Sequence, residues 1–221
     1  MIYELTGSTG AGKSTAFVNI VKTLDENSEK IFTILDSSSV SLVESHIEFI
    51  DIYKFSWKED IKILDSIIMS AIKNVRFLLV SLHAVLKYVP VGDKILMIRV
   101  LLRRLGLAYI AEKKSKDGYK VIVDEGVSHL IHNIFVSKSY VASEKDIKFF
   151  FSAIPKNIKI ILVEAQEEEI FERLMRRKNW STRVSTQEEL SSFINNALIA
   201  FSYIRNEENV IVYSHDSVFC D

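Results

Sequence analysis

The fold of this 221-residue chain is decided by the stretch Gly7-Ser8-Thr9-Gly10-Ala11-Gly12-Lys13-Ser14, followed by Thr15. The stretch fits the pattern G-x-x-x-x-G-K-[ST] in full. Glycines let the backbone curl so that successive N–H groups point at a phosphate, at the positive end of the helix that follows. We therefore predict a phosphate-binding loop over residues 7–15, in which Lys13 reaches the β- and γ-phosphates and Ser14 places its hydroxyl on Mg²⁺.

The residues on either side of the loop predict a strand before it and a helix after it. Residues 2–6 are short and rich in β-forming side chains, and residues 30–35 repeat that pattern. Between them, apolar side chains recur at helical spacing, namely Phe17, Ile20, Val21 and Leu24. A strand–helix–strand opening predicts a parallel sheet with crossover helices.

Three later β-rich runs, at residues 119–123, 159–163 and 209–213, bring the number of predicted strands to five. Residues 40–114 have long helical patterns, and helices are also predicted over 167–178 and 186–203. We expect one α/β domain over residues 1–221, with a five-stranded parallel sheet between two layers of helices. The segment of about 40–114 would form a helical insertion over the carboxyl ends of the strands.

A second motif, Asp124-Glu125-Gly126, follows the apolar strand predicted over residues 119–123. An acid at the end of an apolar strand is what a Walker B site requires, so Asp124 would lie beside the loop and hold Mg²⁺ through water. Glu125 either polarises an attacking water, as in ATPases, or faces an acceptor, as in kinases. The simpler alternative is a solvated carboxylate at a strand end.

A third motif places Arg173, Arg176 and Arg177 at i, i+3 and i+4 on one helical face. Guanidinium groups suit phosphate oxygens and can stabilise charge on a transferring phosphoryl group. Glu169 and Glu172 could pair with these arginines instead and make the face an ordinary solvated one.

Composition and charge exclude several other classes of protein. The chain has 28 lysines and arginines against 29 aspartates and glutamates, so its net charge of −1 favours neither nucleic acid nor an anionic membrane. The longest strongly apolar stretch, residues 77–86, is far shorter than the ~20 residues that span a bilayer. With no signal-like start, we expect a cytoplasmic protein without membrane insertion. The single cysteine, Cys220, excludes an intramolecular disulfide.

With these three motifs in order, the chain resembles P-loop kinases of the nucleoside and nucleoside monophosphate kinase group, including thymidylate kinase-like proteins. The resemblance covers residues 1–36 and roughly 119–215. It implies that residues 7–15 hold ATP and that residues 214–217 lie near the adenine. It also implies a lid of arginines over about 167–185, and an acid that binds the acceptor or takes its proton. The lid arginines would be Arg173, Arg176, Arg177 and Arg183, and the acid Asp36.

The sequence departs from that group after the third predicted strand. Thymidylate kinases usually have Asp-Arg there and deoxynucleoside kinases Glu-Arg-Ser, whereas this chain has Asp124-Glu125-Gly126. Without the arginine that would meet an acceptor phosphate, a neutral hydroxyl compound such as a nucleoside or a sugar is favoured. We therefore expect ATP- and Mg²⁺-dependent phosphoryl transfer to a small molecule, with Asp36 or Glu125 orienting or deprotonating the hydroxyl.

The competing hypothesis is a P-loop ATPase or nucleotide-dependent switch that acts on a protein partner. Asp124-Glu125 suits water activation, and the apolar segment of about 40–114 could be an interaction surface. If the helices of that segment are not covered by their own sheet, they favour a homodimer.

Two further groups, three arginines and two histidines, could contact an acceptor or play only a structural part. Arg99, Arg103 and Arg104 could receive an anionic acceptor, although a solvated helix face is favoured. His129 and His132 share a helical face after Asp124 and could contact an acceptor; without a nearby cysteine or an H-E-x-x-H pattern, zinc is not expected.

Overall fold

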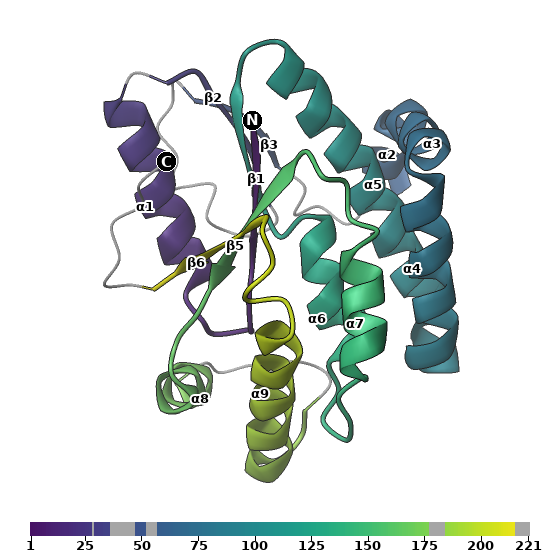
Figure 1. Ribbon diagram of the computed structural model, residues 1–221, viewed down its shortest axis with the longest axis vertical. Coiled ribbons are helices and arrows are strands. Elements are labelled where there is room, and N and C mark those ends of the chain that lie inside the picture. Colours follow the sequence, from purple (N-terminus) through teal and green to yellow (C-terminus); the bar gives the residue numbers. More distant parts are fainter. Residues whose placement is uncertain (28, 36–46, 52–56, 177–183, 215–221) are drawn as a thin grey trace.

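The computed structural model describes residues 1–27, 29–35, 47–51, 57–176 and 184–214, built around a parallel sheet (Figure 1). The sheet has six strands in the order β3-β2-β4-β1-β5-β6. Every pairing within it is parallel. The strands are β1 (Ile2–Thr6), β2 (Ile31–Leu35), β3 (Glu48–Asp51), β4 (Lys120–Asp124), β5 (Ile158–Val163) and β6 (Val210–Tyr213).

The five predicted strands are all present, and the prediction of five is wrong by one. The additional strand is β3, which pairs with β2 at the edge of the sheet. It has four residues, and its Phe49 side chain is exposed. So short an edge strand has no long apolar run to reveal it, and the sequence analysis included it in the helical segment.

The four inner strands and their alternating side chains supply the two halves of the core. In β1, Tyr3 and Leu5 join one apolar cluster, whereas Ile2 joins the other. In β4, Ile122 belongs to the first cluster and Val121 to the second. Because helices cover both faces, these strands are buried on both sides, as expected for a parallel sheet. The predicted three-layer α/β architecture is therefore confirmed.

The helices divide unequally between the two faces of the sheet (Figure 1). On one face α1 (Lys13–Glu26) buries Phe17 and Ile20 against the first cluster. The second cluster includes residues of the later helices. These are α4 (Val75–Tyr88), α5 (Lys94–Lys116), α6 (Leu130–Phe135), α7 (Glu144–Phe151), α8 (Glu167–Met175) and α9 (Gln187–Ser202), with the 3-10 turn η3 (Val127–His129). A second 3-10 turn, η2 (Val91–Asp93), connects α4 to α5 and has no buried residue.

The predicted helical insertion contains α2 (Trp57–Lys62), α3 (Leu64–Lys73), α4 and α5. The long helix α5 packs against β1, β2 and β4, and α3 packs on α5. In the described residues the insertion thus covers a face of the sheet through α5, whereas the sequence predicted it over the carboxyl ends of the strands. Within the described residues, no single helix is both long and apolar enough to cross a membrane.

Candidate active site

The phosphate-binding loop connects β1 to α1 with the backbone geometry that its glycines allow. Gly7 has φ +143° and lies so close to β5 that a Cβ atom there would be 2.4 Å from the carbonyl oxygen of Val163. The loop is closed by a hydrogen bond from the N–H of Ala11 to the carbonyl of Ser8, 3.2 Å. Gly12, with φ +96°, is the last residue before α1 begins at Lys13. The strand, loop and helix therefore follow one another as the motif predicted.

Lys13 is buried and its ammonium group lies within the loop. Its Nζ donates to the carbonyls of Gly7 (3.3 Å) and Ser8 (3.1 Å). It also lies 3.4 Å from Oε1 of Glu125, which follows β4. The first and second motifs therefore meet at this ion pair. A phosphate bound in the loop would compete with Glu125 for the ammonium group.

Asp124 ends β4 beside the loop, because β4 is paired with β1 and Asp124 lies opposite Leu5. Its side chain is buried, while Ser14, in the first turn of α1, is exposed. Carboxylate and hydroxyl oxygens are hard ligands that suit Mg²⁺, which completes its shell with phosphate oxygens and water. The pair therefore fits the predicted metal role. Among the described residues, no cluster of three or more His, Cys, Asp or Glu side chains could hold a metal ion.

Glu125 has a backbone conformation that is uncommon for a side chain other than glycine, with φ +62°. Its carboxylate is partly buried and lies 3.5 Å from Arg104 and 3.4 Å from Nε2 of His129, in addition to Lys13. Burial favours the neutral carboxyl, but the imidazole of His129 and the cations Lys13 and Arg104 outweigh it and hold the pKa of Glu125 well below its ordinary range. Glu125 is therefore an ionised carboxylate enclosed by donors, unlike the solvated side chain of the simpler hypothesis.

Arg104 reaches this site from α5, in the middle of the insertion. It donates from Nη1 to the carbonyl of Gly126 at 3.3 Å, and its Nη2 lies near Glu125. The apolar pattern of α5 predicted a solvated face for its arginines, but Arg103 and Arg104 are both buried. The reason is that α5 is covered on opposite sides by α3 and the sheet, so its apolar pattern does not distinguish a solvent face.

His129 and His132 stack on each other, with ring centroids 5.1 Å apart. Burial lowers the pKa of His129 well below its ordinary value, although the charge of Glu125 opposes this. A neutral imidazole has one N–H, and a carboxylate can only accept, so Nε2 donates toward Glu125. That leaves Nδ1 to accept from the hydroxyl of Thr6, 3.4 Å away. His132 contacts the hydroxyl of Thr9 at the same distance, so both histidines support residues of the loop and its strand.

A glutamate that the sequence analysis did not single out lies beneath these groups. Glu4 is fully buried in the middle of β1, and its carboxyl accepts the backbone N–H of Ser128 at 2.9 Å. Burial raises the pKa of Glu4, and the hydrogen bond from Ser128 offsets this only in part. A Cβ atom on Gly126 would lie 2.1 Å from the Glu4 carboxyl carbon. A glutamate inside a strand that is otherwise apolar was the available signal.

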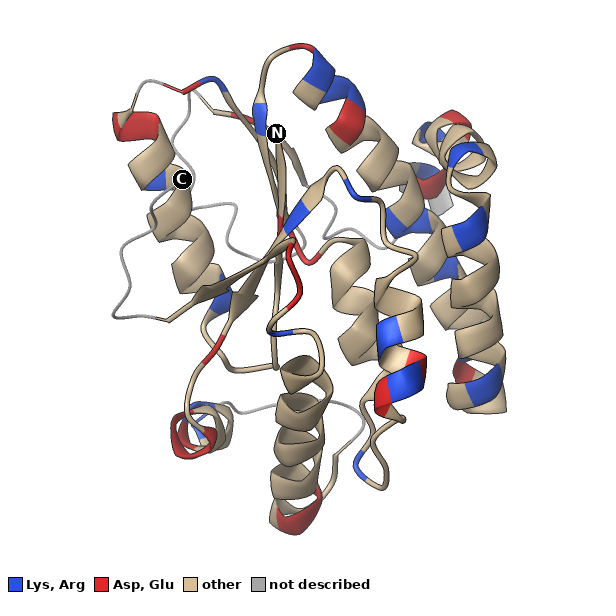
Figure 2. Ribbon diagram, in the orientation of Figure 1, with Lys and Arg blue, Asp and Glu red and all other residues tan. Residues whose placement is uncertain are grey.

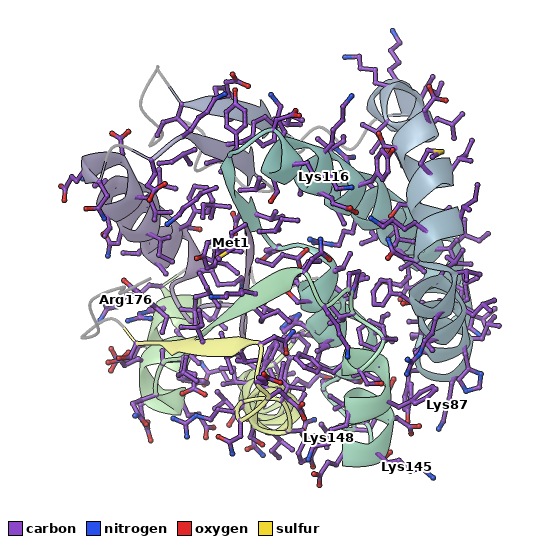
Figure 3. The ribbon with its side chains drawn as sticks, turned by 45° about the horizontal axis from the view of Figure 1, so that its top comes forward. Met1, Lys87, Lys116, Lys145, Lys148 and Arg176 are labelled. Atoms are coloured by element: carbon purple, nitrogen blue, oxygen red, sulfur yellow. The ribbon has the colours of Figure 1, made fainter. Side chains whose placement is uncertain are left out.

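Among the predicted lid arginines, Arg173 lies at the loop. Its Nη1 donates to the carbonyls of Gly10 and Ala11, 3.3 Å each, and its Nη2 pairs with Glu169. Arg176 instead pairs with Glu172 at the edge of the molecule, where its side chain is 80% exposed (Figure 3). The other predicted residues, namely Arg177, Arg183, Asp36 and residues 215–217, lie outside the described part of the chain.

A cavity of about 750 Å³ adjoins the loop, between α8 and the end of α9. Ser8 and Arg173 line its loop side, while Glu164 and Ser214 come from the ends of β5 and β6. Its volume falls in the range of small-molecule sites, roughly 300–1,000 Å³. Ser214, which was predicted to lie near a bound base, is therefore part of a cavity that opens beside the phosphate loop.

Comparison with known proteins gives no matching family model and no matching curated protein. Among solved structures, a deoxyadenosine kinase from M. mycoides with bound dATP is similar at 14% identity, with 99% of this chain and 93% of that chain covered and a TM-score of 0.47. The dCTP-bound form of that enzyme is 12% identical, with 99% of this chain and 92% of that chain covered and a TM-score of 0.46. A thymidylate kinase from Ehrlichia chaffeensis is 12% identical, with 100% of this chain and 90% of that chain covered and a TM-score of 0.43. The two enzymes belong to the group of kinases that the sequence motifs resemble.

Proposed function

We propose that this protein transfers a phosphoryl group from ATP to a hydroxyl of a small, unphosphorylated acceptor such as a nucleoside or a sugar. The observation that carries the proposal is the ion pair between Lys13 of the phosphate loop and Glu125 at the end of β4. It brings a phosphate-binding cation and an ionised acid to the same point, beside the buried carboxylate Asp124. A cytoplasmic setting, where ATP is available, belongs to this proposal.

ATP would be held by the backbone N–H groups of the loop and by Lys13. Arg173 donates to the carbonyls of Gly10 and Ala11 in the loop, and its guanidinium group would receive phosphate charge. The base would enter the cavity that Ser214 lines. Ser14 and Asp124 would hold Mg²⁺, which when bound neutralises charge on the phosphates.

The acceptor hydroxyl would be oriented by Glu125. Because the pKa of Glu125 is depressed, its carboxylate is ionised and can accept a hydrogen bond from a hydroxyl, although it is a weak base. Phosphoryl transfer asks little of a base, since its transition state is loose and catalysis is mostly positioning and electrostatic stabilisation. Asp36 remains the alternative acid. Arg104, whose Nη2 lies 3.5 Å from Oε2 of Glu125, would help to hold that carboxylate in position.

A second candidate, an ATPase or switch with a protein partner, is favoured by one observation. Apolar side chains of the insertion, including Ile72 and Ile95, are largely exposed. In that function Glu125 would orient water in place of an acceptor hydroxyl.

The test measures ADP release by the purified protein with Mg-ATP, alone and with pooled nucleosides, nucleoside monophosphates or free sugars. We expect one neutral-hydroxyl pool to stimulate release at least tenfold. Lys13→Ala should abolish this, whereas Lys22→Ala, on the exposed side of the same helix, should retain it. Steady release that depends on Lys13 and ignores every pool would overturn the kinase proposal in favour of the ATPase.

A further inference from the structure

Glu125 needs contacts that hold it, because its backbone is in an uncommon conformation. Its φ of +62° lies in the left-handed region, where a side chain other than glycine persists only when its surroundings fix it. Figure 2 shows acidic residues where the chain leaves β4 and turns toward α6. At this point the carboxylate of Glu125 contacts Lys13, Arg104 and His129. These three side chains therefore fix the residue that would orient the acceptor.

The three contacts divide between the two oxygens of the carboxylate. Lys13 and His129 both lie 3.4 Å from Oε1, whereas Arg104 lies 3.5 Å from Oε2. Under the proposed function Lys13 turns to the phosphates of ATP and gives up its contact with Glu125. Among the described residues, His129 is then the ion-pair partner left at Oε1. The position of that oxygen therefore depends on His129 at the stage when an acceptor would bind.

The ring of His129 is itself held at its other nitrogen. The side chain is buried, and Nδ1 lies 3.4 Å from the hydroxyl oxygen of Thr6. A carboxylate can only accept, so the imidazole must carry its proton on Nε2 to donate to Glu125. Nδ1 is then an acceptor, and the hydroxyl of Thr6 donates to it. One arrangement of protons satisfies both ends of the ring.

The strand β1 also holds the backbone of the turn that carries His129. Glu4 and Thr6 lie two residues apart in β1, so their side chains point to the same side of the sheet. Glu4 accepts the backbone N–H of Ser128, next to His129 in η3. The N–H of His129 donates to the carbonyl of Gly126 at 3.2 Å. The strand that leads into the phosphate loop thus fixes both the backbone of this turn and the ring.

We propose that His129, whose ring Thr6 orients, is a positioning residue that holds Glu125 in place when Lys13 turns to phosphate. The role rests on the proposed function, in which Glu125 orients the acceptor hydroxyl. The contrasting role is purely structural, with a ring that fills space beside His132, on which it stacks. The two roles differ in one respect, because only the positioning role needs the donor at Nε2.

The first test needs no acceptor and uses nitrogen-15 NMR of the histidine-labelled protein, which has five histidines. We expect His129, assigned with His129→Gln, to carry its proton on Nε2. Lys13→Met removes the ammonium group without a nucleotide and should leave the Nε2–H resonance unchanged, whereas Glu125→Ala should shift it. A proton on Nδ1, or a resonance that ignores Glu125→Ala, would overturn the inference even for an active enzyme. Circular dichroism should show the same fold in these variants.

The second test compares turnover in the acceptor pool that stimulates ADP release. His129→Phe keeps a ring but has no donor, so turnover should fall about thirtyfold while the Kd for ATP stays within about twofold. His129→Gln, whose amide can donate to Glu125, should recover about tenfold of that loss. Thr6→Val should lower turnover about fivefold, because the ring keeps its donor and loses its anchor. His83→Gln, at an exposed position on α4, is the matched control and should turn over as the wild type does.

The outcomes separate this inference from the proposed function. Equal losses of turnover in His129→Phe and His129→Gln, or a loss of ATP affinity in proportion to turnover, would assign the ring a structural role. If no pool stimulates ADP release, the proposed function fails. The resonance of His129 in Lys13→Met and Glu125→Ala then decides by itself whether His129 holds Glu125.

Discussion

The candidate active site buries side chains that are usually exposed, and the insertion surface exposes side chains that are usually buried. The insertion surface is the exposed side of α2–α4, η2 and the first turn of α5. At the site, Glu4, Lys13 and Arg104 are charged or ionisable groups that are buried. On the insertion surface, the apolar side chains of Ile72 and Ile95 are exposed. Buried charge costs stability unless it is paired, and here each cation contacts a carboxylate or carbonyl. Exposed apolar side chains such as these have no such compensation among the described residues. The first region is therefore internally balanced, and the second leaves apolar side chains in contact with water.

The helix α5 belongs to both regions. Its first turn carries Ile95 on the insertion surface, and its middle carries Arg104 into the site. The same helix is covered by α3 on one side and by the sheet on the other. Substitutions can therefore be chosen that address one region and leave the other intact.

The largest effect is expected where the site is most tightly packed. Gly126→Ala would place a methyl group against the carboxyl of Glu4, which is fully buried and held by Ser128. We expect a loss of about 3 kcal/mol in the free energy of unfolding, measured with urea. Gly92→Ala is the matched control, since a Cβ atom there meets nothing within 4 Å.

A double substitution shows whether Glu4 is the cause. Glu4→Ala removes the obstructing carboxyl, so the combined loss in Glu4→Ala with Gly126→Ala should be smaller than the sum of the two single losses. Additive losses would show that another contact opposes the methyl group.

Glu125→Gln tests whether the charges of the site are balanced against one another for function. The amide no longer attracts Lys13, so a phosphate has less competition and the Kd for ATP should fall about fivefold. Turnover should also fall, by about a hundredfold, because the acceptor loses the ionised group that orients it. Calorimetric titration and initial rates measure the two effects. Glu172→Gln, on the exposed side of α8, is the control. Weaker ATP binding in Glu125→Gln would contradict the competition between Glu125 and phosphate.

The pKa of Glu4 predicts how stability depends on pH. Because burial raises this pKa, the folded state favours the neutral carboxyl, and its contribution is present at low pH and lost as pH rises through the raised pKa. Glu4→Gln cannot ionise. Its stability relative to the wild type should therefore increase between pH 4.5 and pH 8. Urea unfolding at the two pH values measures this, with Glu26→Gln at an exposed position as control. A constant difference would mean that Glu4 keeps one protonation state throughout.

The two regions also differ in how far the sequence revealed them. The strand, loop and helix around residues 7–13 and the place of Asp124 at the end of β4 could be predicted, because their spacing along the chain is fixed by local backbone chemistry. Arg104 could not, because its position depends on which side of α5 faces the sheet, and both sides are covered. Glu4 and Gly126 are 122 positions apart in the sequence, and the Glu4 carboxyl occupies the space that a Cβ atom on residue 126 would need. A single sequence does not show such a pair. The edge strand β3 was too short to be recognised.

The insertion surface was partly visible in the sequence, as an apolar segment of about 40–114 with no recognisable acceptor signature. The sequence could not show which of its apolar side chains remain exposed. That depends on how α3 and α4 meet at Asn74, where their axes turn by 99°.

The smallest effect is expected on the insertion surface, and it would confirm that the surface adds nothing to folding. Ile72→Gln removes an apolar side chain that is mostly in water, so the free energy of unfolding should change by no more than about 0.5 kcal/mol. The matched control is Ile20→Gln, on the buried side of α1, which should cost about 3 kcal/mol or more because it buries an unpaired amide. A comparable loss in Ile72→Gln would mean that this side chain is buried in solution, by a second copy or by the chain itself. The contrast between the two regions would then disappear.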